Sequence, residues 1–247
     1  KMEKLLDTNI DNNKMLIAYG TSFIYDKNKN YKKAFKYSKF ANQIINQKIT
    51  YTNDIKKILE TTPSEFNILH KNRINLKNEY SPIFIVGMPR SGTTMIEKVL
   101  GNSEEVDEMG ELVTMDRLIT KRKIEGINWP YNISKFTKID LEDIGKNYIN
   151  VVKEINPKIK KKFTDKMPSN FQLIGFICSA IPEAKIIHTR RDPGATCWSN
   201  FKHYFISEGL GYTYDLQDTL RFFKLYQNLM DFWDHALGEH IYHLDYD

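Results

Sequence analysis

The stretch IFIVGMPRSGTTMIEKVL, residues 83–100, constrains the fold of this chain more than any other. Its first four residues, Ile83 to Val86, are all apolar, which is typical of a buried parallel strand. Gly87 ends the strand, a tight loop follows, and Thr93 opens a segment with apolar residues at helical spacing. This order brings free backbone N–H groups and the helix dipole to one point, where proteins bind phosphate-like anions. We call residues 87–94 the anion loop.

The anion loop departs from the loop that binds nucleoside triphosphates. Gly87 and Gly92 have the spacing of the two glycines in G-x-x-x-x-G-K-[ST], but Thr93 stands where the lysine belongs. The basic residue is Arg90, on the loop itself. The sequence therefore predicts an anion site without the lysine that grips the β- and γ-phosphates.

Further strands and helices alternate after the anion loop. Strands are expected at 162–164, 185–189 and 240–244, helices at 112–120, 141–155, 171–181, 195–206 and 216–237, and a loop at 126–134. This alternation predicts an α/β fold, a P-loop-like parallel sheet with right-handed crossovers, flanked by helices.

The N-terminal part has a helical pattern from about residue 12 to residue 60. Small residues at Ala34, Ser38 and Ala41 would let two antiparallel helices pack closely. The run YKKAFKYSKFAN resembles the second helix of a tetratricopeptide repeat, although an ordinary helical hairpin fits as well. One helix pair is too little for a solenoid, so it would be the last repeat of a longer array or a cap. A third helix is expected at 53–61, and residues 62–80 are expected to be a linker to a domain at 81–247.

The composition of the chain limits the kinds of ligand and partner it is expected to bind. The net charge of +5 and the pI of about 8.9 suit an anionic ligand, but no basic stripe with exposed aromatics indicates nucleic acid. No apolar run reaches the roughly 20 residues of a membrane span, and no signal peptide is visible, so a cytoplasmic protein is expected. The chain starts at Lys1 without a Met. Cys178 and Cys197 sit in apolar helical patterns and are expected to be buried thiols, and no residue cluster has zinc spacing.

A second candidate anion site follows the strand KIIHT. Arg190 and Arg191 come at the expected carboxyl end of that strand, where open α/β sheets bind ligands. Asp192 is expected to hold one of the two arginines, and Ser199 lies about two turns into the next helix. A guanidinium and a hydroxyl can together bind a second phosphate, although a solvated Arg-Arg-Asp turn is the plainer interpretation.

Together the two motifs resemble the sulfotransferase family. PRSGTT is similar to that family's loop for the 5′-phosphosulfate of 3′-phosphoadenosine 5′-phosphosulfate (PAPS), and RRDPGATCWS is similar to its 3′-phosphate motif. Tetratricopeptide-linked bacterial sulfotransferases, which are similar to tyrosylprotein sulfotransferases, are the nearest match, from about Tyr31 to the C-terminus. The resemblance implies PAPS as co-substrate, no metal, and in-line sulfuryl transfer to a hydroxyl.

The resemblance also implies roles for individual residues. Cofactor binding would fall to residues of the anion loop and the second motif: Arg90, Ser91, Gly92, Thr93, Thr94, Arg191 and Ser199. Arg90 and Lys166, in TDKMP, would act on the transferring group, and Glu111, in MGEL, would deprotonate the acceptor. A surface position is the alternative for Lys166. His188 is a weaker candidate base, and Glu104, Glu105, Asp107 and Glu108 are rivals in a charged run expected to be a solvated loop.

HLDYD resembles the start of a Tyr-Glu-like motif after which the family continues with more helices, so the domain is expected to be truncated at its C-terminus. The acceptor is left open among a protein tyrosine, a glycan and a small hydroxyl compound, and a homodimer is possible. A P-loop kinase or NTPase and a non-catalytic helical-repeat interaction protein are the alternative functions.

Overall fold

The computed structural model describes residues 5–6, 11–47, 54–75, 79–121, 132–205 and 208–247. The chain divides into two compact units. One unit comprises residues 54–191 and 225–247, and the other comprises residues 1–53 and 192–224. Of the loop expected at 126–134, residues 126–131 lie outside the described residues, and a 3-10 turn begins at Ile133.

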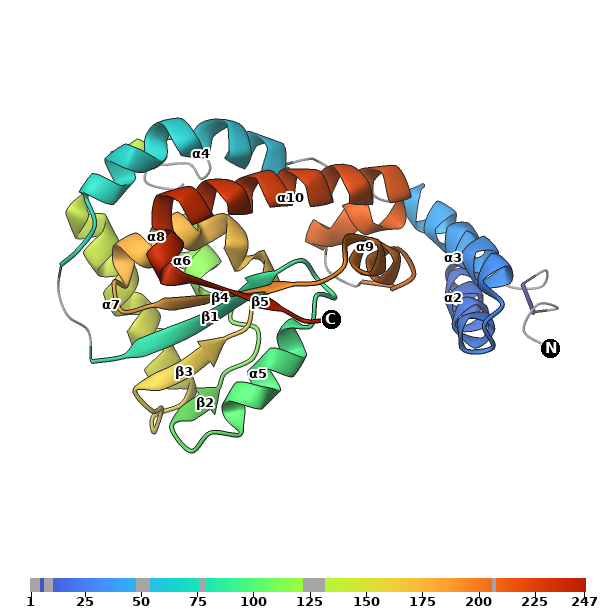
Figure 1. The fold of residues 1–247 in the computed structure, drawn as a ribbon, viewed down its shortest axis with the longest axis horizontal. Coiled ribbons are helices and arrows are strands. Elements are labelled where there is room, and N and C mark those ends of the chain that lie inside the picture. Colours follow the sequence, from blue (N-terminus) through green and yellow to red (C-terminus); the bar gives the residue numbers. More distant parts are fainter. Residues whose placement is uncertain (1–4, 7–10, 48–53, 76–78, 122–131, 206–207) are drawn as a thin grey trace. The chain divides into compact units, whose positions relative to one another are not determined.

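The first unit is built on a five-stranded parallel sheet (Figure 1). The strands are β1 (Ser81–Gly87), β2 (Val106–Glu108), β3 (Lys162–Asp165), β4 (Lys185–Arg190) and β5 (Ile241–Asp245), in the order β2-β3-β1-β4-β5. The predicted α/β class and parallel sheet are thus confirmed. Because every strand runs the same way, their carboxyl ends and the loops that follow them share one edge of the sheet.

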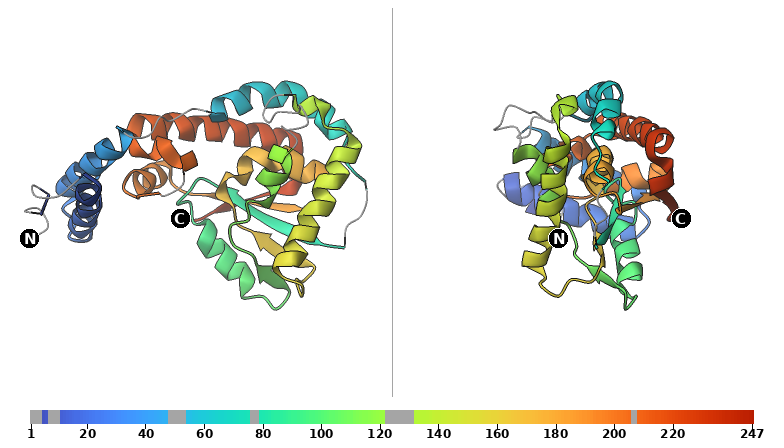
Figure 2. Two further views of the ribbon diagram at one scale, coloured as in Figure 1. Left: turned by 180° about the vertical axis from the view of Figure 1, so that it is seen from behind. Right: turned by 90° about the vertical axis from the view of Figure 1, so that its left-hand side faces the viewer.

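Helices flank this sheet. They are α4 (Asp54–Lys71), α5 (Thr93–Gly101), α6 (Thr114–Lys121), α7 (Lys138–Ile155), α8 (Ile174–Ala180) and the C-terminal part of α10 (Leu216–Leu237). The side view of Figure 2 shows α5 and α7 on opposite sides of the sheet. A capping box fixes the start of α7: the Thr137 hydroxyl accepts from the Asp140 N–H, and the Asp140 carboxylate accepts from the Thr137 N–H.

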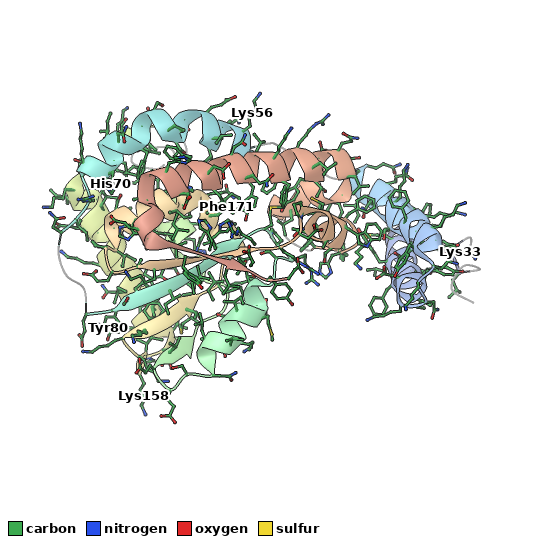
Figure 3. The ribbon with its side chains drawn as sticks, in the orientation of Figure 1. Lys33, Lys56, His70, Tyr80, Lys158 and Phe171 are labelled. Carbon is green, nitrogen blue, oxygen red and sulfur yellow. The ribbon has the colours of Figure 1, made fainter. Side chains whose placement is uncertain are left out.

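Aromatic side chains fill the space between sheet and helices. Phe84 of β1 packs on Tyr148 of α7 with ring centroids 5.5 Å apart. Trp233 of α10 is buried, and its indole N–H donates to the carbonyl of Phe171, 2.9 Å away. Phe171 lies in the interior below α10 (Figure 3). Strands and helices are therefore tied at both layers of the unit, which gives the carboxyl edge a rigid base.

The structure corrects three expectations for this unit. The third helix does not end at Thr61 but continues through Pro63 to Lys71, so the expected linker begins inside α4. Residues 168–173 form the 3-10 helix η3, so only 174–180 of the helix expected at 171–181 is α-helical. The charged run at 104–108 is not a loop throughout, because Val106–Glu108 pairs with β3 as an edge strand.

The second unit contains the helical hairpin expected from the sequence. α2 (Asp11–Lys27) packs on α3 (Tyr31–Asn46) through the small residues Ala34, Ser38 and Ala41, all of them buried. The Ser22 and Ser38 hydroxyls hydrogen-bond at 2.7 Å across this contact. The unit also holds α9 (Pro193–Phe201), which ends before the expected Ile206, together with η4 (Glu208–Tyr214) and the start of α10. The tetratricopeptide likeness of the hairpin stays a prediction.

Both cysteines, Cys178 and Cys197, are free and buried, as predicted. Among the described helices, none has the length and apolarity to cross a membrane. Within the same described residues, no group of three or more histidine, cysteine and carboxylate side chains could hold a metal ion.

Candidate active site

The loops at the carboxyl edge of the sheet carry nearly all of the site residues predicted from the sequence. The anion loop follows β1, Glu111 follows β2, Lys166 follows β3 and Arg191 follows β4. Adjacent strands lie about 4.8 Å apart, and β1 pairs with both β3 and β4. The fold therefore gathers residues that are far apart in sequence along one short edge.

The anion loop has the backbone of a built anion site. Gly87, Arg90 and Gly92 all have positive φ, at 151°, 68° and 99°. A non-glycine residue seldom adopts such a conformation, so these outliers mark a tightly constrained turn. The Ser91 hydroxyl is buried and hydrogen-bonds the Thr189 hydroxyl of β4 at 2.7 Å. Helix α5 begins directly after Gly92, so its N-terminal N–H groups and the positive end of its dipole face the loop.

Arg191 joins the second motif to the anion loop. Its Nη1 donates to the carbonyl of Arg90 at 3.3 Å, and its Nε pairs with Asp247 at 3.2 Å. The guanidinium also lies over the Tyr246 ring, 5.5 Å from the centroid. Tyr246 is fixed in turn because its backbone N–H donates to the carbonyl of Arg190 at 2.8 Å. The structure thus brings Arg90 and Arg191 together.

The other residues of the second motif have different partners. Arg190 forms a bidentate pair with Asp245, at 2.9 and 3.0 Å. Asp192 caps α9, since its carboxylate accepts from the Ala195 N–H at 2.7 Å. Ser199 lies on α9, in the other compact unit, and is partly buried. Its pairing with Arg191 around one phosphate therefore stays a prediction.

Lys166 and Glu111 are in direct contact. Lys166 Nζ lies 2.5 Å from Glu111 Oε1, with the lysine side chain 8% exposed and the glutamate side chain 57% exposed. The backbone N–H of Lys166 donates to the carbonyl of Gly110 at 2.9 Å, which ties the end of β3 to the segment after β2. Lys166 is thus not the surface residue of the alternative interpretation, because its buried stem directs the ammonium group to the carboxyl edge.

Two buried acids, Glu97 and Asp165, lie next to the backbone segments that carry Glu111 and Lys166. Glu97 of α5 accepts from the Gly110 N–H at 3.0 Å and from the Thr164 hydroxyl at 2.8 Å. Burial raises the pKa of Asp165 to about 8, although the Tyr148 hydroxyl donates to its carboxylate at 2.9 Å. These contacts hold the backbone on either side of Glu111 and Lys166 in place.

Three of the four rivals of Glu111 pair with lysines. Glu105 pairs with Lys162 at 2.6 Å, Asp107 pairs with Lys160 at 3.1 Å, and Glu108 pairs with Lys98. The hydrogen bond from Lys162 lowers the pKa of Glu105, and the one from the Lys160 backbone lowers the pKa of Asp107. A carboxylate whose pKa is lowered is a weaker general base, which disfavours Glu105 and Asp107. Glu111 differs from all three acids in following the end of β2 at the carboxyl edge.

Comparison with known proteins assigns the family. A family model described as "Sulfotransferase family" matches residues 82–247, about two thirds of the chain. The chain belongs to the sulfotransferase family. The matched region begins at β1 and includes every strand of the sheet together with the anion loop and the second motif.

Individual relatives of this sulfotransferase-family chain are distant. An uncharacterized protein of Aquifex aeolicus (strain VF5) is 28% identical over 235 residues, which are 90% of this chain but 31% of that protein. The chain therefore spans about a third of the length of this curated relative. The sulfotransferase domain of the Synechococcus PCC 7002 olefin synthase is 16% identical, with a TM-score of 0.44, and covers 70% of this chain and 68% of its own. Sulfotransferase STF9 of Mycobacterium avium is 14% identical, with a TM-score of 0.43, over 76% and 63% of the two chains.

Sequence reasoning missed several residues that shape the candidate site of this sulfotransferase-family chain. Thr189 and Glu97 hold the anion loop and the Glu111 segment, and the Tyr246 ring packs against Gly92. An acid inside an otherwise apolar helix face was a signal for Glu97, but nothing local marks Thr189 or Tyr246. His188 is buried and hydrogen-bonds Tyr226 and His243. It is therefore a hydrogen-bonded core histidine and not a candidate base.

Proposed function

We propose that this chain transfers a sulfuryl group from PAPS to an acceptor hydroxyl by in-line displacement. The observation that carries the proposal is that the anion loop, Arg191 and the Lys166–Glu111 pair meet at one edge of one sheet. The family match supports the same reaction class. The chain spans only about a third of the length of its curated relative, so the sulfotransferase activity of the protein as a whole is also a proposal.

The donor set fits a nucleotide with phosphates at both ends. Arg90, Ser91, Gly92, Thr93 and Thr94 would hold the 5′-phosphosulfate, because they combine inward backbone N–H groups, hydroxyls and one guanidinium at a helix N-terminus. Arg191 and Ser199 would hold the 3′-phosphate through paired N–H donors and a hydroxyl. Bound PAPS would supply an activated sulfuryl group whose leaving group is a phosphate.

The protein's part in the reaction is positioning, charge stabilisation and proton removal. Arg90 and the loop N–H groups would stabilise the negative charge that develops on the leaving phosphate. Lys166 would contact the bridge between sulfuryl group and phosphate. Glu111 would take the proton from the acceptor hydroxyl, whose oxygen forms the new bond to sulfur.

The contact between Lys166 and Glu111 supports this division of roles. The exposed carboxylate can be approached by an acceptor, whereas the buried ammonium faces the same edge as the anion loop. A nucleotide anion would compete with Glu111 for the Lys166 ammonium group. Nucleotide binding would then release Glu111 to act on the acceptor.

Acceptor identity is a separate proposal. A protein tyrosine, a glycan and a small hydroxyl compound each present an O–H to Glu111. The tetratricopeptide-like hairpin α2–α3 favours a macromolecular acceptor or a homodimer contact, since such repeats bind other chains through exposed helix faces.

The binding half of the proposal is tested by thermal unfolding with 3′-phosphoadenosine 5′-phosphate. We expect the nucleotide to raise the melting temperature of the wild type, and Arg191→Ala or Ser199→Ala to reduce that rise. Arg221→Ala is a matched control, because Arg221 lies on the exposed face of α10 and pairs with Asp218. If ATP with Mg²⁺ stabilised the chain more than this nucleotide, a kinase or NTPase would replace the proposal.

The transfer half is tested with sulfur-labelled PAPS. Peptide, glycan and phenol acceptors would be offered in separate reactions. Transfer of the labelled sulfuryl group to only one of these classes would identify the acceptor class. Nucleotide binding without transfer to any class would favour a non-catalytic interaction protein.

A further inference from the structure

A chain of hydrogen bonds leads from the anion loop to the surface of the same unit. The Met88 N–H of the loop donates to the Tyr226 hydroxyl, which hydrogen-bonds His188 Nε2. His188 Nδ1 lies 2.8 Å from His243 Nδ1, and His243 Nε2 lies 2.8 Å from Asp234 Oδ1. Tyr226 and His188 are buried, while Asp234 is exposed.

The chemistry of the groups fixes the direction of every hydrogen bond. A carboxylate only accepts, so His243 Nε2 carries a hydrogen and donates to Asp234. In neutral His243 the Nδ1 atom is then an acceptor, so His188 Nδ1 must donate to it. This leaves His188 Nε2 as an acceptor for the Tyr226 hydroxyl. With His243 neutral, the chain therefore donates in one direction, from the Met88 N–H to the Asp234 carboxylate.

A proton taken up by His243 reverses part of the chain. Both nitrogens of the imidazolium carry hydrogen, so His188 Nδ1 has to accept. The His188 proton then sits on Nε2 and is donated to Tyr226, whose own hydroxyl hydrogen becomes available to another acceptor. One proton enters at His243 and His188 stays neutral throughout. Burial and the neighbouring His243 support this, since they lower the pKa of His188 to about 3.

We propose that Tyr226, His188 and His243 form a relay that ties the hydrogen-bond donors around the anion loop to the protonation of His243. Tyr226 and His243 are then positioning residues. Protonation of His243 makes the Tyr226 hydroxyl hydrogen available beside the anion loop, so the affinity of the loop for an anion rises as the pH falls. The proposal uses the nucleotide of the proposed function as its ligand, but the relay itself is independent of that function.

Several charged and titratable groups surround the relay. Asp234 accepts from His243, and this hydrogen bond lowers the pKa of Asp234. The charges of Asp245 on β5 and Arg190 on β4 act on His188 as well, and His235 on α10 acts on Asp234. Arg190 is itself paired with Asp245.

The first experiment reads the relay without any ligand. Imidazole nitrogen shifts measured by NMR between about pH 5 and about pH 8 should show His188 as the Nδ1–H tautomer at high pH. We expect His188 to switch to Nε2–H, and the Met88 amide signal to move, at the pH where His243 takes up its proton. His188 found as Nε2–H at high pH, or a Met88 signal indifferent to His243, overturns the relay.

The second experiment measures nucleotide affinity over the same pH range. In the wild type, affinity for 3′-phosphoadenosine 5′-phosphate should rise on the order of fivefold as His243 is protonated, about the effect of one hydrogen bond. Tyr226→Phe keeps the ring and the charge of His243 but breaks the relay, so this rise should disappear. His235→Gln, which removes a histidine whose ring bonds the Asp231 carbonyl instead, should behave like the wild type.

The outcomes separate the two proposals. A rise that survives in Tyr226→Phe would show that the charge of His243 acts alone, and the relay would be wrong. If the wild type binds no nucleotide, the proposed function fails, and the NMR titration still decides whether the relay exists.

Discussion

Lys166 Nζ lies 2.5 Å from Glu111 Oε1, and this contact joins a lysine that is almost fully buried to a glutamate that is more than half exposed. The two residues follow β2 and β3, which are neighbours in the sheet. Their different exposure gives them different partners: the lysine can meet only a group bound at the carboxyl edge, whereas the glutamate can meet one that arrives from solvent.

Replacing Glu111 by Gln should abolish transfer and leave nucleotide binding intact. Glutamine keeps an oxygen for Lys166 but cannot take a proton, so turnover should fall by about 10²- to 10⁴-fold. Labelled transfer and calorimetric nucleotide binding measure the two effects. Glu108→Gln is the control, because Glu108 pairs with Lys98 and should not affect turnover. Retained turnover in Glu111→Gln would refute the assignment of the base.

Replacing Lys166 by Met should also slow transfer. Methionine retains the buried stem but removes the positive charge beside the transferring group, so turnover should fall by about 10²- to 10³-fold, as for other groups that stabilise transition-state charge. Steady-state kinetics measures the loss. Lys162→Met is the control. Lys162 is an exposed lysine at the start of β3 that pairs with Glu105, so its loss should leave turnover unchanged. Equal losses in the two variants would contradict a specific role for Lys166.

Replacing Gly92 by Ala should weaken both the loop and its ligand binding. A Cβ at Gly92 would lie 2.2 Å from Tyr246 Cδ2, and the φ of 99° strains any L-residue by about 1–2 kcal/mol. The melting temperature and the nucleotide affinity should therefore both fall.

Two further variants separate these causes. Gly110→Ala adds a Cβ at a φ of 66° with no atom within 4 Å, so it carries the backbone strain without the clash. Adding Tyr246→Ala to Gly92→Ala should relieve the clash and restore part of the stability. If Gly92→Ala cost no more than Gly110→Ala, the Tyr246 contact would not be structural.

Stability should fall with acid because His188 is buried in its neutral form. Burial and His243 lower the pKa of His188 from 6.5 to about 3, so between these values the unfolded chain binds a proton that the folded chain does not. The contribution of His188 to the free energy of unfolding is therefore fully present above pH 6.5. It declines by about 1.4 kcal/mol per pH unit as the pH falls below that value. Urea titrations from about pH 7 to about pH 5 measure the slope. His188→Gln should be less stable at pH 7 but should lose about this much slope, and an unchanged slope would contradict the assignment.

The sequence predicted those parts of the fold that depend on local patterns. The run Ile83–Val86 and the glycines around it were enough for β1, the anion loop and α5, because a buried strand and a helix N-terminus have local signatures. The helix expected at 53–61 is shorter than α4, which continues through Pro63, a residue type that usually ends a helix. Ile55, Ile58, Phe66 and Leu69 are nevertheless buried along one face, and this packing carries the helix past the proline.

Other parts depend on tertiary contacts and left no local signal. Strand β2 has three residues, two of them acidic, and it is a strand because β3 pairs with it. The contact of Lys166 with Glu111 joins two loops, and spacing along the chain does not predict it. His188 could have faced either side of β4, and only the position of Tyr226 on α10 decides its environment.

The packing of Tyr246 on Gly92 has a consequence for how the site is assembled. The anion loop is short and local in sequence, but its supports lie far along the chain: Tyr226 is on α10, and Tyr246 directly follows β5. Contacts between distant parts of a chain form late, because a long loop must be closed first. During synthesis the loop residues leave the ribosome well before these supports exist, so the anion site should be among the last features of the unit to reach its final geometry.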